Sequence, residues 1–177
     1  GTGAQTVYNA TIKYLPILPG TFTVYNGTLT STPQASDAFG RADANHLSGN
    51  WTKSTSFFDL QLASNHVEST STSGASAAYY NGVTWSNFND QSSTITIGAI
   101  GGSGFLASLA RWQSASASGY QCRIGHPLGV STPVSIVRTD FASDVLLASG
   151  TANASAGQTV ECDALGSAIT MQVNGSV

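Results

Sequence analysis

Short runs in which apolar and polar residues alternate recur along most of the chain, separated by clusters of Gly, Asn, Ser and Pro. This two-residue period predicts β-strands, whereas the spacing of an amphipathic helix is nearly absent. The runs follow one another roughly every 8 to 15 residues. This spacing predicts an all-β chain of two packed antiparallel sheets, a β-sandwich. One run, residues 105–114, is also compatible with a short helix.

The predicted strands divide into an N-terminal pair and a longer series. Residues 5–15 and 20–30 are two runs joined by a loop rich in Pro and Gly, and they predict a hairpin. Residues 1–35 are therefore expected to form a β-hairpin arm with its linker, and residues 36–177 the sandwich domain. The runs of the sandwich lie at residues 57–70, 77–85, 93–101, 105–114, 119–126, 134–140, 145–152, 158–166 and 168–176.

Composition narrows the class of protein. Of the 177 residues, 41% are hydrophobic, which is enough for a packed core, but only 8% are charged. Solubility must then come from hydroxyls and amides, which suits an extracellular or particle-bound β-protein. The net charge of −3 and the scattered Lys and Arg residues exclude a basic patch for nucleic acid. No apolar run approaches the roughly 18 residues of a membrane span.

The densest group of distinctive side chains is "SDAFGRADANHLSGNW", residues 36–51. It contains an acid-x-Phe-x-Arg-x-Asp motif followed by Leu, Gly and Trp. With these residues in this order, the chain resembles the concanavalin A-like, laminin G-like jelly-roll superfamily over most of residues 36–177. The resemblance implies a jelly-roll sandwich and leaves the function open, because that fold hosts lectins, glycanases, adhesion modules and virus structural domains. The matching positions are Asp37, Phe39, Arg41, Asp43, Leu47, Gly49 and Trp51.

Two roles are considered for this motif. In the structural role, Phe39 and Trp51 enter the core while Arg41 makes charge-assisted hydrogen bonds to Asp37 or Asp43. In the other role the motif binds Ca²⁺, since jelly rolls of this type often carry a calcium ion held by loop carboxylates and amides. The candidate calcium ligands are Asp37, Asp43 and Asn45.

The segment "YYNGVTWSNFND", residues 79–90, is the best candidate for binding a glycan. Exposed aromatic rings stack on sugars, and neighbouring amides and acids bind the hydroxyls. The other interpretation places these aromatic residues in the core, because alternate positions of a strand point inward. The candidate ligand-binding residues are Tyr79, Tyr80, Trp85, Asn87, Phe88 and Asp90.

Catalysis is not expected. A glycanase needs two carboxyl groups about 5 to 9.5 Å apart, and the chain has two glutamates, Glu68 and Glu161. Glu161 and Asp163 share one strand face, but the pattern also fits two solvated carboxylates. The three histidines are well separated in sequence, and no G-x-S-x-G nucleophile motif is present.

Cys122 and Cys162 lie inside predicted strands. They either form a disulfide between neighbouring strands in an oxidising compartment or remain two small buried thiols.

The favoured function is a non-enzymatic structural or adhesion component of an extracellular assembly, with a phage virion as the leading case. The N-terminal hairpin resembles β-modules of phage tail and baseplate proteins. Members of the jelly-roll superfamily usually add a strand after an Asn-Gly turn such as the one at residues 174–175. The sheet edge at which that further strand would pair is expected to be covered by residues 5–30 or by a strand of a neighbouring subunit. The expected partners are thus further copies of the chain or other subunits of a particle. The alternative is a carbohydrate-binding module of a larger secreted protein, with a surface glycan as ligand.

Overall fold

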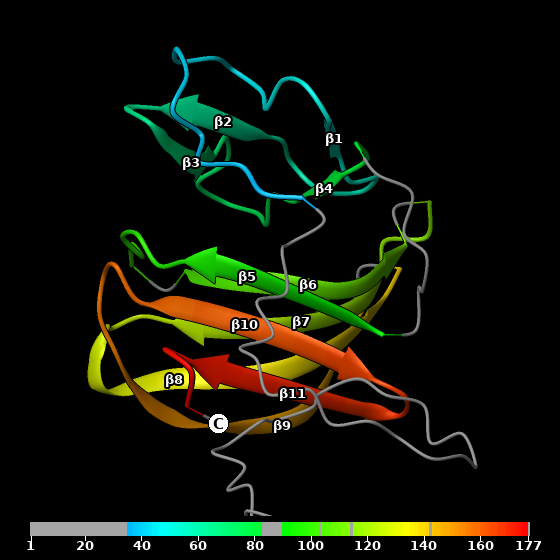
Figure 1. Ribbon diagram of the computed structural model, residues 1–177, viewed down its shortest axis with the longest axis vertical. Helices are drawn as coiled ribbons and strands as arrows, with labels where there is room; N and C mark the ends of the chain where they lie inside the picture. The colour runs from blue at the N-terminus through cyan, green and yellow to red at the C-terminus, as the bar shows by residue number, and fades with distance from the viewer. Residues whose placement is uncertain (1–34, 83–89, 103, 114, 142, 177) are drawn as a thin grey trace, which may run out of the picture. The chain divides into compact units, whose positions relative to one another are not determined.

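Figure 1 shows the computed structural model, which describes residues 35–82, 90–102, 104–113, 115–141 and 143–176. Every regular element in these residues is a β-strand, and the paired strands run antiparallel in four sheets. The prediction of an all-β, antiparallel chain is therefore confirmed. The predicted hairpin of residues 5–30 lies outside the described residues.

The two larger sheets contain the second half of the chain. The four-stranded sheet has the order β6-β7-β8-β9, so that its strands are neighbours both in sequence and in space. The three-stranded sheet has the order β11-β10-β5. The strands are β5 (Gln91–Thr96), β6 (Phe105–Gln113), β7 (Ser118–Gly125), β8 (Gly129–Asp140), β9 (Ser143–Ala154), β10 (Thr159–Leu165) and β11 (Ala168–Val173).

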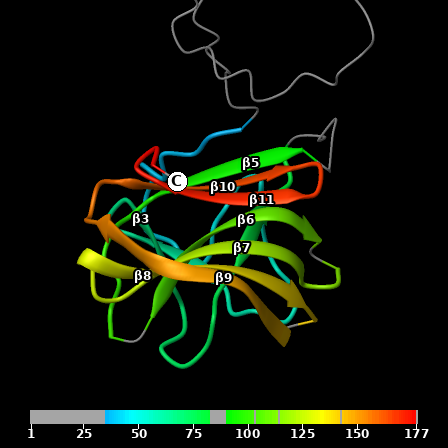
Figure 2. The same ribbon diagram turned by 90° about the horizontal axis from the view of Figure 1, so that it is seen from below.

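These two sheets face each other as two layers around a shared apolar core, which is a sandwich-like arrangement (Figure 2). Every second side chain of a strand points to the same face of its sheet, and these side chains form the core. On β10, for example, Val160, Cys162 and Ala164 are all 0% exposed. Ile124 of β7 is buried to the same extent from the opposite sheet. Residues 105–114, which were also compatible with a helix, contribute Ala110 to this core from strand β6.

A disulfide between Cys122 and Cys162 crosses the core. Cys122 lies on β7 and Cys162 on β10, so the bridge joins the two facing sheets. Of the two alternatives considered from the sequence, the disulfide is the one present, but it joins facing sheets rather than neighbouring strands of one sheet. Strand pairing cannot be deduced from spacing alone, and the two cysteines are 40 residues apart in the chain. The covalent link fixes the distance between the two layers at their centre.

One side of the sandwich is closed by side-chain hydrogen bonds between the edge strands β5 and β6. Ser108 Oγ donates to the backbone oxygen of Ser93 at 2.7 Å, and Ser93 Oγ donates to the backbone oxygen of Leu109. The opposite side is formed by the other two edge strands, β9 and β11. These hydrogen bonds join the two sheets along the side formed by β5 and β6.

The first described segment forms two small sheets with a core of their own. In one sheet β1 (Trp51–Lys53) pairs with β4 (Ala78–Tyr80), and in the other β2 (Leu60–Ala63) pairs with β3 (His66–Ser69). Their core contains buried Leu47, Leu62 and Ala78. These strands had been predicted as part of the two main sheets. At three or four residues each they are too short to span the sandwich.

Residues 57–70 were predicted as a single strand, but the structure folds them into the β2–β3 hairpin. Ser64 and Asn65 both have positive φ, 51° and 64°, which is the conformation of a two-residue type I′ turn. Asn is among the residues that adopt this conformation most readily. The "SN" pair was therefore a turn signal inside an apparently continuous alternation.

A β-bulge in β6 links the small sheets to the larger ones. The register with β7 shifts between Ala110 and Gln113, and the bulge turns Trp112 toward the small sheets. Its Nε1 donates to Ser54 Oγ at 3.0 Å, and its ring lies 5.6 Å from that of Phe57. Gly119 on β7 allows this packing, since a Cβ there would lie 2.9 Å from the indole of Trp112.

Removing the disulfide should destabilise the sandwich strongly. The double substitution Cys122→Ala with Cys162→Ala is expected to lower the free energy of unfolding by about 2–5 kcal/mol, because the unfolded chain regains the entropy of an open loop. Urea unfolding of the oxidised protein and the double variant measures the difference. Reductant should destabilise the wild type and leave the double variant unchanged. Equal stability of the two oxidised proteins would contradict a structural role for the bridge.

Candidate functional site

The carboxylate of Asp37 organises the motif at residues 36–51. Its two oxygens accept hydrogen bonds from Arg41 Nη1 at 2.8 and 2.9 Å. The backbone N–H of Phe39 and the indole Nε1 of Trp51 also donate to it, each at 2.8 Å. The structure thus places Arg41 against Asp37 rather than Asp43, and one carboxylate ties together a turn, a cation and the first residue of β1.

Two opposing effects act on the pKa of Asp37. Burial raises the pKa of the carboxyl, because it penalises the charged form. The hydrogen bonds from Arg41, Phe39 and Trp51, together with the charge of Arg41, lower it by more. The net result is a pKa below the ordinary value of 3.8, so Asp37 is ionised at neutral pH.

The aromatic rings of the motif pack beside this carboxylate. Phe39 and Trp51 have ring centroids 5.5 Å apart, and the guanidinium of Arg41 lies 5.5 Å from the centroid of Phe39. Both rings pack against the core of the small sheets. Phe39 and Trp51 are therefore half-buried in a secondary core and not in the core between the main sheets.

The three residues considered for calcium have different surroundings. Both oxygens of Asp37 are occupied by N–H donors, so a cation would have to displace Arg41 from them. Asp43 Oδ1 accepts from the backbone N–H of Ser64 at 2.8 Å, and Asn45 is exposed. Among the residues that the structure describes, no group of three or more His, Cys, Asp or Glu is arranged to hold a metal ion. Calcium binding by this motif stays a prediction.

The two tyrosines considered for glycan binding lie on β4, opposite β1. Tyr80 pairs with Trp51 across the sheet, and the two rings meet edge to face at 5.3 Å. Its hydroxyl accepts a hydrogen bond from Asn50 Nδ2 at 3.0 Å. Tyr80 therefore has packing and hydrogen-bond partners within the small sheets, and Tyr79 is half-buried on the neighbouring position.

The remaining candidates for glycan binding are not brought together with the tyrosines by any contact in the described residues. Asp90 Oδ1 accepts from the backbone N–H of Gly166 in the β10–β11 turn. Trp85, Asn87 and Phe88 lie outside the described residues. The glycan site stays a prediction.

The acidic pair on β10 faces away from the core between the sheets. Glu161 Oε1 accepts from Ser92 Oγ at 2.7 Å, and Asp163 Oδ2 accepts from Gln172 Nε2 at 2.9 Å. Asp163 is 6% exposed, so it is not the solvated carboxylate that the sequence pattern had indicated. Each carboxylate interacts with a neighbouring strand of its own sheet, which is a cross-strand arrangement.

Several exposed apolar side chains of the described residues lie on or next to β9, the edge strand of the four-stranded sheet. This strand is twelve residues long, and nine consecutive residues from its start are exposed. Leu146 is 62% exposed and Leu147 49%, and Phe141 in the preceding turn is 78% exposed. A long, exposed, apolar edge strand is unusual in a protein that acts alone, because its free backbone groups can pair with another chain.

Two features hold β9 in place. A network on the outer face fixes its start: Arg123 on β7 donates to Asp144 Oδ2 at 2.6 Å, and Thr139 donates to the other oxygen of Asp144 at 2.8 Å. Farther along, a register shift leaves Leu147 as the extra residue of a β-bulge against β8. The bulge twists the edge locally, and the carboxylate of Asp144 is held by Arg123 and Thr139 of its own sheet.

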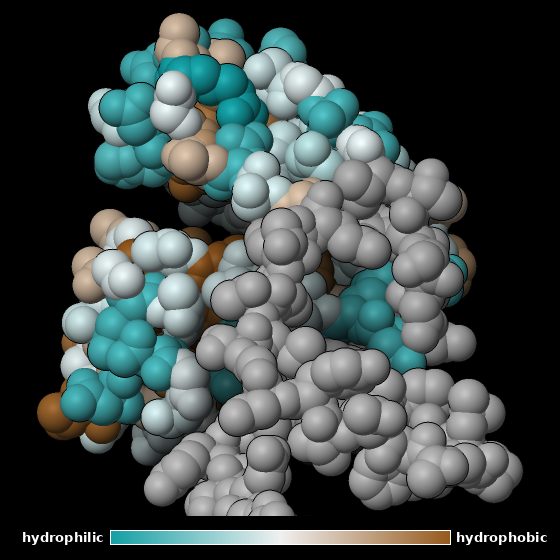
Figure 3. Space-filling view, in the orientation of Figure 1, coloured by the Kyte–Doolittle hydropathy of each residue, from teal (hydrophilic) through white to brown (hydrophobic). Residues whose placement is uncertain are grey.

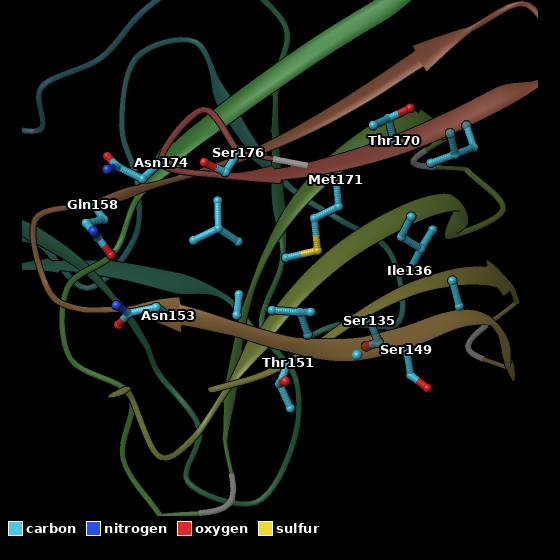
Figure 4. A pocket seen from close by; sticks show the side chains of 16 residues that line it. Ser135, Ile136, Ser149, Thr151, Asn153, Gln158, Thr170, Met171, Asn174 and Ser176 are labelled. Carbon is cyan, nitrogen blue, oxygen red and sulfur yellow. The ribbon is translucent and has the colours of Figure 1, made fainter. Parts of the chain in front are cut away.

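A groove of about 770 Å³ separates β9 from β11 on the open side of the sandwich (Figure 4). Its apolar lining includes Ile136 from β8 and Met171 from β11, and Asn153 and Gln158 lie at one end. The described residues that line it carry no charged side chain. Over the described residues of the face that Figure 3 displays, hydrophilic and near-neutral side chains predominate over smaller hydrophobic patches. The groove therefore suits an uncharged ligand that forms hydrogen bonds through groups such as the N–H and C=O of a peptide backbone.

Sequence reasoning missed this groove as a ligand site. Its lining residues are Ser, Thr, Asn, Ala and aliphatic types, which carry no chemistry that stands out in a chain of this composition. One signal was available, since Asn174–Gly175 is a turn signal at the end of a predicted strand. It does not indicate that β9 and β11 face each other.

Comparison of the chain with protein-family models, curated proteins and solved structures found no match. The resemblance to the concanavalin A-like superfamily therefore stays a prediction. No helix long and apolar enough to cross a membrane occurs among the described residues.

Asp37 should stabilise the fold in a pH-dependent manner. Asp37→Asn is expected to lower the free energy of unfolding by about 1–3 kcal/mol at neutral pH, because several donors lose a charged acceptor. Since the folded-state pKa is lowered, this contribution is fully present above the ordinary value of 3.8 and disappears as the pH falls through the folded-state value. Urea unfolding of the wild type and the variant between neutral pH and acid measures it.

Asp43→Asn is the matched control, because Asp43 lies in the same loop but accepts a single described hydrogen bond, from Ser64. We expect a smaller loss of stability from this substitution, below about 1 kcal/mol. A difference between wild type and Asp37→Asn that does not shrink in acid would contradict the assigned role of the ionised carboxylate.

Proposed function

We propose that the chain is a non-enzymatic structural or adhesion component of an extracellular assembly, with a phage virion as the leading case. The carrying observation is the edge strand β9, which presents twelve residues, with Val145, Leu146 and Leu147 exposed, at a sheet edge. Burying such an edge against another subunit removes apolar surface from water and pairs its free backbone groups.

The disulfide supports the extracellular part of the proposal. Disulfides persist in oxidising environments and on the surfaces of virions, and they are rare in the cytosol. The Cys122–Cys162 bridge lies at the centre of the core, where it stabilises the sandwich without depending on charge. The low charge of the chain, 8%, is consistent with a subunit that contacts others over neutral surfaces.

The surroundings of the acidic residues support the non-enzymatic part. Glu161 and Asp163 each interact with a strand neighbour, Ser92 and Gln172 respectively. Their role in holding β5, β10 and β11 together accounts for the pair without chemistry. The concanavalin A-like jelly-roll identity of residues 36–177 belongs to the same proposal and rests on the motif around Asp37.

The proposal predicts association through the edge of β9. The full chain is expected to self-associate, and Leu146→Lys should weaken the association at least about tenfold, because a charge would be buried or repelled at the contact. Sedimentation velocity over a range of concentrations measures the effect. Since Leu146 is 62% exposed, the stability of the subunit should change by less than about 0.5 kcal/mol.

Phe58→Lys is the matched control, because Phe58 is 52% exposed but lies just before β2, among the small sheets and outside β9. It should leave association unchanged. A chain that remains monomeric at all concentrations, or one that binds a glycan on an array and loses binding on Trp85→Ala, would contradict the proposal and favour the carbohydrate-binding module.

A further inference from the structure

Among the described residues, β11 pairs with no strand on the side away from β10, and one isolated antiparallel bridge lies at its end there. Asn174 and Gly175 have φ of 50° and 77°, the geometry of a type I′ hairpin turn. Beyond this turn, Ser176 exchanges two backbone hydrogen bonds with Val173, at 2.8 and 3.0 Å. The chain has thus turned back and begun an antiparallel ladder on the side of β11 that faces away from β10.

The direction of the backbone groups along β11 follows from these bonds. The N–H and C=O of Val173 point to the free edge, whereas the N–H of Asn174 donates to the backbone oxygen of Thr159 on β10. Because backbone groups alternate along a strand, those of Ile169 and Met171 also point to the free edge. These two residues line the groove, so the groove wall offers donors and acceptors in the register of an antiparallel partner.

The opposite wall is the free edge of β9, with Ala148, Gly150 and Ala152 among its lining residues. In Figure 4 the residues Ser149, Thr151 and Asn153 advance along β9 in the same direction as Thr170, Met171 and Asn174 along β11. A strand that runs opposite to β11 therefore also runs opposite to β9, and it can pair antiparallel with both edges.

A strand in this position would complete the sandwich. The other side is already joined by Ser93 and Ser108 between β5 and β6, so both sides of the two sheets would then be connected. Side chains that point inward would meet Ile136 and Met171, and those that point outward would lie beside Ser149 and Thr151. The fitting sequence is uncharged and alternates small hydroxyl with apolar residues.

We infer that the groove accepts residues 20–25 of a second copy of the chain as an antiparallel strand. This segment, "GTFTVY", is uncharged and alternates threonine with Phe22 and Val24, which matches the neutral walls and apolar lining of the groove. The other N-terminal run, residues 5–15, contains Lys13, whose charge would be costly to bury there. Residues 20–25 lie outside the described residues, and the inference rests on the groove and on their sequence.

The inference deepens the proposed function and rests on it. Insertion of a segment from one copy into the groove of the next is a heterologous contact, which closes into a ring or grows into a filament according to the rotation between copies. Main-chain hydrogen bonds to β9 and β11 would supply affinity, and the pockets for alternate side chains would supply specificity. The inference thus assigns the contact that holds neighbouring subunits together.

Cross-linking between two single-cysteine variants of the full chain tests the inference. Ala148→Cys places a thiol on the groove wall, and Thr23→Cys places one in the docking segment. The native cysteines are bridged and 0% exposed, so they do not compete. After mixing and mild oxidation, a mixed dimer is expected to form at least about tenfold faster than with the control pair, because docking raises the local thiol concentration.

The control pair combines Thr23→Cys with Ser73→Cys, which is exposed in the loop between β3 and β4. In a second measurement, Ala148→Glu should abolish association by placing a charge in the groove, with the subunit still folded by circular dichroism. A cross-linking rate equal to the control overturns the inference. So does a cross-link that forms only within one chain carrying both cysteines, since the segment would then come from the same copy.

The outcomes separate this inference from the proposed function. If the chain associates and Leu146→Lys weakens the association, but the groove does not cross-link and tolerates Ala148→Glu, the assembly function stands and the strand-accepting groove falls. If the chain does not associate at all, the proposed function and the inference both fail.

Discussion

The packing of the two main sheets across one disulfide-linked core is the constraint on which the rest of the structure depends. Cys122 on β7 and Cys162 on β10 hold the layers at a fixed separation, surrounded by buried residues such as Ile124 and Val160. The β5 and β6 edges are joined by Ser93 and Ser108. The layers are fixed at the centre and joined on one side, and on the other side β9 and β11 border a groove.

The features proposed to act in assembly all lie on that open side, and they use backbone and neutral groups. The edge of β9 is exposed over most of its length, its acid is turned toward Arg123, and the groove lining is uncharged. The described residues that line the groove carry no charge, so a strand bound there has no ion pair to form with them. Shape, apolar burial and main-chain hydrogen bonds remain as the available means, and these are what a sheet edge provides.

The motif around Asp37 has a different part in the fold. Its hydrogen bonds to Arg41, Phe39 and Trp51 build a corner that closes a small secondary core. Concentrated acids, a cation and aromatic rings are features of ligand sites, but here they satisfy one another. The bulge at Trp112 then connects this corner's sheets to β6 through Ser54 and Phe57, so the motif contributes to stability at a distance from the open edge.

The sequence by itself determined the class of the fold, most strand positions and the character of the surface. Those properties depend on local alternation, turn residues and composition, which act over a few residues. Only the tertiary structure decided that residues 57–70 form a hairpin, that the disulfide joins facing sheets, that Asp163 is buried and that β9 and β11 line a groove. Each of these features depends on which strands lie next to one another. When several strands share the same alternating pattern, the local sequence of a strand does not indicate which strand it pairs with.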